Sequence, residues 1–341
     1  MAKRIAWLDI AKGITIILVI FGHTFAPGML TREVIFSFHM PLFFILAGYT
    51  FKVRPTAEQA KKAVPQLLAP FLLTFLVCQV ILNAVGQEQL GAAFLMQLIK
   101  AMVWTTGYTY APLDVPAVGM IWFLACLFLS RIVFNLLLGG LERQNCPEWL
   151  RALIFVAVAA CGVVIGSTMN IYLPFCLDLV MVAQLFLYLG WLAKRYDFPR
   201  FLTKAWCILT CLVIWVLAIC FSHIELATRS YSEAAAPLAF AGAIAGTCLC
   251  CWLAIVIERY LSFLIPPLLF LGQTTLFILC IHAIEGNLID WMASPLLADA
   301  PAPYLLASII RTVFILAIAW LAHVTLPKTM PQPQAKTGKD I

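Results

Sequence analysis

Long apolar runs alternate with short polar segments along almost the whole chain. A run of about 17–25 apolar residues is long enough to cross the hydrocarbon core of a bilayer as a helix. Ten such runs can be read at residues 5–24, 34–51, 65–85, 118–138, 151–169, 171–192, 203–222, 237–257, 266–284 and 304–324. The pattern predicts an all-α fold, a polytopic membrane helical bundle of about ten transmembrane helices. We expect one integral membrane domain over residues 1–327 and a polar, disordered cytoplasmic tail over 328–341.

Two stretches interrupt this regular pattern. Residues 87–116 are too polar and too broken to span a bilayer, and the part from Ala92 to Trp104 predicts a helix lying in the membrane interface. Asn170 and Pro174 are the only turn signals between the fifth and sixth runs, so these runs either form a tight hairpin or divide at a different point.

Basic residues fall in alternate loops and set the orientation of the bundle. The residues concerned are Lys3, Arg4, Lys52, Arg54, Lys61, Lys62, Arg143, Arg151, Lys194, Arg195, Arg200, Lys204, Arg259, Lys328, Lys336 and Lys339. Because cytoplasmic loops carry an excess of Lys and Arg, these loops are expected on the cytoplasmic side. The sequence therefore predicts a multi-pass protein of the inner (plasma) membrane with both termini in the cytoplasm.

Composition supports the membrane assignment. The 341 residues are 63% hydrophobic and 11% charged, with a mean hydropathy of +0.98, whereas soluble proteins carry about 25% charged residues. The net charge of +6 reflects topology, and we expect no nucleic-acid partner. All but one of the twelve cysteines lie in apolar runs and none shows zinc-ligand spacing, so no metal is expected.

Ionisable residues inside the first run are the most informative feature. The step of 11 residues from Lys12 to His23 is about three turns plus ~20°, so both side chains share one helix face about 16 Å apart along the axis. Asp9 joins that face at its inner end. An ionisable residue within a span costs about 2.5–3.5 kcal/mol and usually faces a cavity or the bundle interior. The alternative is a snorkelling Asp9–Lys12 pair at the membrane boundary.

Further polar residues are expected at the depth of His23, in the outer half of the bundle. They are His39, Trp122, His282, Glu285 and Arg311. Each has a structural alternative: a histidine can be a hydrogen-bonded packing residue, Trp122 can belong to the aromatic belt, and Arg311 can pair with Glu285. His223 and His323 have no partner that the sequence identifies, and we interpret them as structural.

Two motifs resemble the integral membrane acyltransferase-3 family, particularly its branch similar to fucose 4-O-acetylases and O-acetyltransferases of surface polysaccharides. The first span resembles L-D-x-x-[RK]-G followed by G-H, with Leu8, Asp9, Lys12, Gly13, Gly22 and His23. The second resembles F-x-F-H-M-P-L-F-F-x-x-[SA]-G, found over residues 36–48. The W-F-L of residues 122–124 matches, and L-x-x-x-H ending at His282 matches loosely.

The resemblance implies transfer of an acyl group, most simply acetyl, from cytoplasmic acetyl-CoA to a hydroxyl of a sugar or glycan acceptor. It implies catalysis by His23 and His39, donor binding by Lys12, Asp9, Lys61 and Lys62, and acceptor binding by Trp122, His282, Glu285, Arg311 and Ser37. Two departures stand out. Lys12 replaces the usual arginine and loses its bidentate fork, and Gln66 lies in a stretch that usually carries arginines.

A histidine with an unperturbed pKa of about 6.5 is a suitable base for a sugar hydroxyl. His23 is expected to fill this role, whereas His39 could orient it, donate to the oxyanion or act as a second base. The rival function is a secondary transporter of a small polar solute, compatible with Pro41 and Gly48 in the second span and Pro266 in the ninth. No inverted repeat supports that alternative.

Overall fold

The structure is a computed structural model that describes residues 5–84, 92–110, 113–291 and 302–325. Apart from one small hairpin, the regular elements of this part of the chain are helices. The α-helices are α1 (Ala6–Gly22), α2 (Leu30–Phe36), α3 (His39–Tyr49), α4 (Thr56–Ala63), α5 (Ala69–Ala84), α6 (Ala92–Val103), α7 (Trp122–Arg143), α8 (Glu148–Val163), α9 (Leu177–Arg195), α10 (Ala205–Phe221), α11 (Ala236–Tyr260), α12 (Ile265–Gln273), α13 (Thr275–Gly286) and α15 (Pro303–Thr325).

The helical bundle is confirmed, but the number of spans is lower than ten. Within the described residues, seven helices are long and apolar enough to cross a bilayer, and the bent pair α12–α13 adds an eighth if it counts as one span. The difference lies in α1 and α10. Each coincides with a predicted span but has only 17 residues, which is about 25 Å of helix. Both end where polar residues begin, at His23 and Ser222.

The broken stretches of sequence also fold as short elements. A helix forms at Ala92–Val103, as predicted, and is followed by an antiparallel hairpin of β1 (Thr106–Tyr110) and β2 (Leu113–Ala117), which the sequence analysis did not anticipate. A π-helical turn extends α8 to Thr168, and α9 begins after Pro174–Cys176, so of the two alternatives the hairpin between the fifth and sixth runs is the one present. The predicted tail, 328–341, lies outside the described residues.

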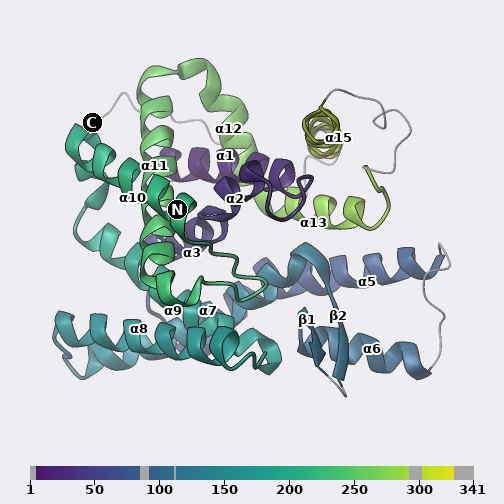
Figure 1. The fold of residues 1–341 in the computed structure, drawn as a ribbon, viewed down its shortest axis with the longest axis horizontal. Coiled ribbons are helices and arrows are strands. Elements are labelled where there is room, and N and C mark those ends of the chain that lie inside the picture. The colour runs from purple at the N-terminus through teal and green to yellow at the C-terminus, as the bar shows by residue number, and fades with distance from the viewer. Residues whose placement is uncertain (1–4, 85–91, 111–112, 292–301, 326–341) are drawn as a thin grey trace.

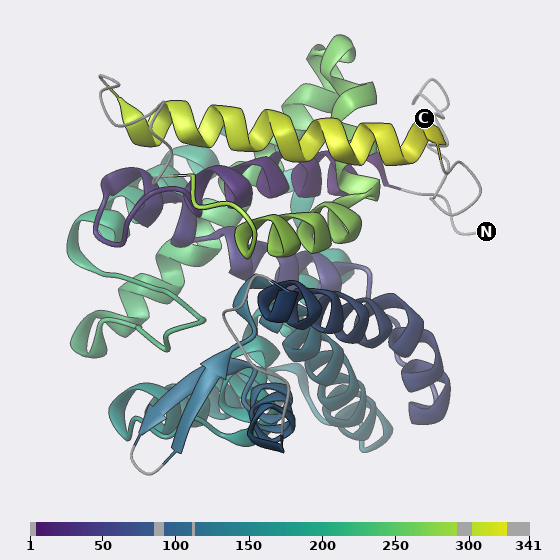
Figure 2. The same cartoon turned by 90° about the vertical axis from the view of Figure 1, so that its right-hand side faces the viewer.

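The helices form two groups. In Figures 1 and 2, α5, α6, α7, α8 and the hairpin lie together in the lower half, while α1, α12, α13 and α15 lie in the upper half. The helix α3 packs against α9, which joins the two groups because α9 also contacts α7 and α8. Figure 2 shows that α1 begins and α15 ends on the same side of the molecule. The side of a membrane on which these helix ends lie stays a prediction.

The helix α1 lies at the centre of the upper group and packs against α2, α3, α11, α12, α13 and α15. Its closest neighbour is α12, where two glycines allow backbone contact. A Cβ atom on Gly272 would lie 1.8 Å from the carbonyl oxygen of Asp9, and one on Gly13 would lie 2.4 Å from that of Leu268. Real Cβ atoms do not approach backbone oxygens so closely, so only glycine permits this packing. The contact holds the Asp9–Lys12 segment against the end of α12.

Candidate functional site

A cavity of about 660 Å³ runs along α1. Residues Lys12, Ile16, Val19 and His23 line it at successive turns of that helix, as the predicted shared face requires. The rest of its wall comes from α2, α3, the π-helical turn Val64–Leu68, α7, α12, α13 and the loop before α11. We call its two ends the histidine end, lined by His23, His39, Trp122 and Arg32, and the lysine end, lined by Lys12, Gln66, Arg131 and Gln273.

The histidine end brings three predicted residues together. His23 follows the last residue of α1, His39 begins α3, and Trp122 begins α7, so each side chain sits at a helix terminus facing the cavity. The rings of His23 and His39 lie 6.4 Å apart, with Phe36 packed 5.0 Å from the first and 4.5 Å from the second. This end of the cavity therefore presents two imidazoles in an aromatic wall.

Hydrogen bonding determines which nitrogen of His39 is available. Its Nδ1 lies 3.1 Å from the carbonyl oxygen of Ile35. A carbonyl oxygen only accepts, so Nδ1 carries the hydrogen and donates it, which leaves Nε2 as the acceptor in the neutral ring. By contrast, the buried Nδ1 of His23 has no hydrogen-bond partner among the described residues. His23 is therefore the histidine whose tautomer the surrounding protein leaves open.

His282, Glu285 and Arg311 form a buried chain behind His23 and are absent from the cavity wall. The ring of His282 lies 5.4 Å from that of His23, and its Nδ1 is 3.3 Å from Oε2 of Glu285. Arg311 donates from Nε and a terminal nitrogen to the same oxygen, both at 3.0 Å, and Trp291 donates to the other oxygen. The guanidinium and carboxylate offset each other's charge, so this pair is structurally complete without a ligand.

The lysine end carries the second predicted group. Lys12 donates to Asp9 Oδ1 at 2.6 Å, and the lysine lines the cavity while the aspartate is buried beside α12. Gln273 ends α12 at the 67° bend that separates it from α13, and its buried Oε1 has no hydrogen-bond partner among the described residues. Gln66 lies on the π-helical turn and also faces this cavity.

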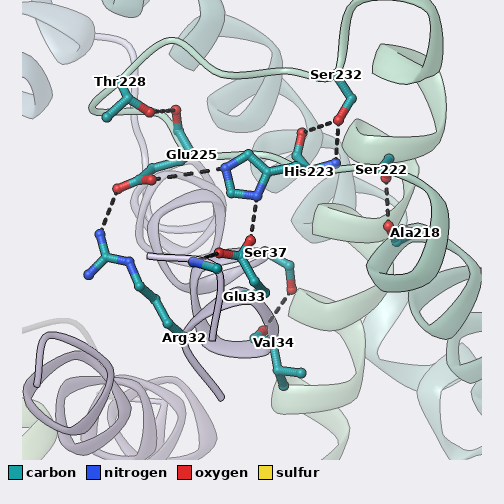
Figure 3. A network of polar contacts seen from close by, with 11 residues as sticks. Arg32, Glu33, Val34, Ser37, Ala218, Ser222, His223, Glu225, Thr228 and Ser232 are labelled. Carbon is teal, nitrogen blue, oxygen red and sulfur yellow. Dashed lines mark hydrogen bonds and ion pairs between the residues drawn. The ribbon is translucent and has the colours of Figure 1, made fainter. Parts of the chain in front are cut away.

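A polar network lies at the histidine end of the cavity, and Figure 3 shows its contacts. Arg32 donates to Glu225 Oε1 at 3.0 Å, and both residues line the cavity. His223 lies between Glu33, which it contacts through Nδ1, and Glu225, 4.0 Å from its Nε2. The guanidinium of Arg32 also stacks 3.9 Å above the Phe36 ring, next to both histidines. The sequence identified no partner for His223, but in the structure its contacts with these two carboxylates link α2 to the loop after α10.

A buried ion pair anchors that loop. Asp178, at the start of α9, accepts from Arg229 Nε at 2.6 Å and from a terminal nitrogen at 3.4 Å. The exposed fractions of the two side chains are 0% and 2%. Because a bidentate pair of this kind has a defined geometry, it positions the segment that carries Glu225, Leu226 and Ala227 to the cavity.

Three further predicted residues, Ser37, Lys61 and Lys62, lie away from the cavity wall. Ser37 accepts a hydrogen bond from Trp215 Nε1 at 2.9 Å and donates to Val34. Lys61 and Lys62 are exposed on the last turn of α4. Pro65 and Gln66, about one turn further along the chain, line the cavity. The two lysines therefore do not line the lysine end themselves, but the segment that follows them does.

The sequence analysis missed Arg32, Glu225 and Arg131. Arg32 and Glu225 lie in a short helix and a loop on the side expected to be poor in basic residues. From sequence alone, a single charge in such a segment is interpreted as solvent-exposed. Arg131, however, lies within the fourth predicted run, and a charge inside a span is the signal that could have identified it. Among the described residues, no group of three His, Cys, Asp or Glu side chains is placed to hold a metal ion.

Comparison with known proteins agrees with the sequence motifs. Residues 5–324 match the profile of a family described as "Acyltransferase domain", the acyltransferase-3 group. A search of curated proteins finds no match to this chain. The match spans every helix that lines the cavity. The chain therefore belongs to the acyltransferase-3 family of multi-pass membrane proteins and is an acyltransferase.

Proposed function

We propose that this acyltransferase moves an acetyl group from cytoplasmic acetyl-CoA to a hydroxyl of a sugar or cell-envelope glycan, in the inner (plasma) membrane with both termini cytoplasmic. The observation that carries the proposal is one cavity with cations at one end and two histidines at the other. Acyl transfer between two compartments requires such a passage, because the donor and acceptor must meet from opposite sides.

The length of the cavity suits an acyl-CoA donor. Lys12 and His23 are separated by about 16 Å along α1, which is comparable with an extended pantetheine arm. With the phosphates at the lysine end, the thioester would reach His23 and His39. Lys12 forms an ion pair with Asp9, and a charge-assisted contact to phosphate is the kind of interaction that an ammonium makes well.

The chemistry at the histidine end follows from proton positions. His23 accepts the proton of the acceptor hydroxyl as its oxygen attacks the thioester carbonyl, and the C–S bond then breaks as the proton passes to the leaving thiolate. His39 donates through Nδ1 to Ile35, so its neutral ring offers an acceptor nitrogen to the cavity. That arrangement favours a second base or a hydroxyl-binding role over donation to the oxyanion.

The buried chain behind His23 suits a positioning role. His282 does not line the cavity, so it is not placed to contact a substrate. Its Nδ1 is oriented by Glu285. Arg311 in turn fixes Glu285. We therefore assign these three residues to orienting His23 and not, as the sequence suggested, to direct acceptor binding. We assign acceptor contacts instead to Trp122, Arg32 and Glu225 at the histidine end of the cavity.

The test uses the purified protein in lipid nanodiscs together with cells that carry or lack the chain. Radiolabelled acetyl-CoA should transfer its label to extracted envelope glycans when the protein is present, and glycan mass spectra should show an increment of one acetyl group. The His23→Ala variant is the matched control. A solute gradient that dissipates only when the protein is present, with no label transferred, would support transport and contradict the proposal.

A further inference from the structure

Arg131 is a cation inside the bundle that the mechanism above does not use. It lies in the middle of α7, on the same face as Leu124 and Leu127, and lines the cavity with them and with Trp122, the first residue of that helix. From Trp122 to Arg131 the helix advances about 13.5 Å, nearly the distance that separates His23 from Lys12 on α1. Helix α1 thus carries His23 near one end and Lys12 further along, and α7 carries Trp122 and Arg131 at a similar separation.

The neighbours of Arg131 place it at the lysine end. Leu127, one turn before it, lines a second, smaller cavity together with Lys12 and Thr50, and residues four apart share a helix face. Gln66 comes from the π-helical turn that packs against α7. Arg131 therefore faces the same space as Lys12 and is separated from the histidines by the length of the cavity.

Arg131 has no counter-charge in the described residues. Its Nε is buried without a hydrogen-bond partner, and none of the ion pairs between those residues includes its guanidinium. Asp9 accepts from Lys12 and Glu58 pairs with Arg54, so the carboxylates in the surrounding segments are occupied. Buried charges in proteins are normally paired. A guanidinium that lines a cavity without a partner indicates that an anion completes the site.

We propose that Arg131 binds the diphosphate of the acyl donor, opposite Lys12, and so fixes how deep the pantetheine arm enters the cavity. This inference rests on the proposed function, since it takes acetyl-CoA as the donor. Arginine suits the site because its planar fork can hold two phosphate oxygens at once, which the point charge of Lys12 cannot do. Lys12 and Arg131 outnumber the single carboxylate of Asp9, so the lysine end has a net positive charge that would attract an anion.

The experiment measures binding to the full-length protein in nanodiscs with two probes, coenzyme A and pantetheine, which lacks the diphosphate. Arg131→Gln should weaken coenzyme A binding about 10- to 100-fold, the factor that a charge-assisted hydrogen bond contributes, and should leave pantetheine binding unchanged. Arg131→Lys should recover part of the loss. Arg143→Gln removes an exposed arginine from the same helix, outside the cavity wall, and is the matched control.

The outcomes separate this inference from the function on which it rests. If the wild type binds coenzyme A and Arg131→Gln binds it equally well, the role of Arg131 is wrong and the acyltransfer proposal stands. Equal losses for coenzyme A and pantetheine would show that Arg131 only maintains the fold, which also overturns the inference. A wild type that neither binds coenzyme A nor transfers acetyl would overturn both proposals.

Discussion

Among single residues, His23 differs from its two neighbouring histidines in the freedom of its ring nitrogens. Nδ1 of His39 is committed to a backbone carbonyl and Nδ1 of His282 to a carboxylate, whereas Nδ1 of His23 is buried without a partner in the described part of the chain. A general base must take up a proton and release it within one reaction. A ring with no fixed tautomer meets that requirement better than one whose hydrogen is already assigned.

Replacing His23 by alanine should therefore abolish the chemistry and spare the donor site. General base catalysis contributes about 10²–10⁴-fold, so the rate of acetyl transfer should fall by that factor. Coenzyme A binding should change little, because the phosphates are expected about 16 Å away at the lysine end. Both quantities can be measured on one nanodisc preparation. Near-normal transfer by His23→Ala would remove His23 from the catalytic role.

Glu285 offers a test of positioning as distinct from catalysis. Glu285→Gln keeps the volume but loses the charge that holds His282 and Arg311, and a small misplacement of a catalytic group can cost up to about 10²-fold in rate. If Glu285 acts only through His23, the same change should have no further effect in the His23→Ala background. Thermal unfolding of each variant controls for the weakened buried pair. A loss of equal size in both backgrounds would mean that Glu285 acts independently of His23.

Among elements, the crossing of α1 and α12 determines the lysine end. A methyl group at position 272 would collide with the backbone oxygen of Asp9, which cannot move aside as a flexible side chain would. Gly272→Ala should destabilise the protein by about 1–3 kcal/mol, the cost of overpacking, and should also displace Lys12. Gly140→Ala, on α7 where nothing lies within 4 Å of the added carbon, should be neutral or slightly stabilising. Thermal unfolding in detergent compares the two; an equal effect would contradict the close contact.

At the scale of the whole molecule, the inward and outward faces remain a prediction from the basic loops. Residues 145 and 290 follow α7 and α13, and the charge pattern predicts that they lie on opposite sides of the membrane. A short protease site inserted after Asp290 should be cleaved from outside intact spheroplasts, and one inserted after Asn145 should be cleaved only after lysis. Cleavage of both sites from outside would contradict the predicted topology, and the lysine end could then not be assigned to the cytoplasmic side.

Much of the fold could be read from the chain because span formation is local. A bilayer leaves every backbone group to be satisfied within its own helix, so a long apolar run is sufficient to predict one. The error in the span count came from α1 and α10, which end at the polar residues His23 and Ser222 after only 17 residues each. Hairpin β1–β2 was missed because its residues alternate too weakly to predict strands.

For the candidate site too, some relations follow from the sequence and others only from the tertiary structure. Spacing along one helix determined that Lys12 and His23 share a face, and the motifs around Asp9, His23 and His39 identified the family, because these relations depend only on helix geometry and residue order. Only the tertiary structure decided that His282 packs behind His23, that Arg131 lines the same cavity as Lys12 and that Arg32 pairs with Glu225. Those relations depend on how helices far apart in sequence cross, and side-chain packing sets such crossings without leaving a periodic pattern in the chain.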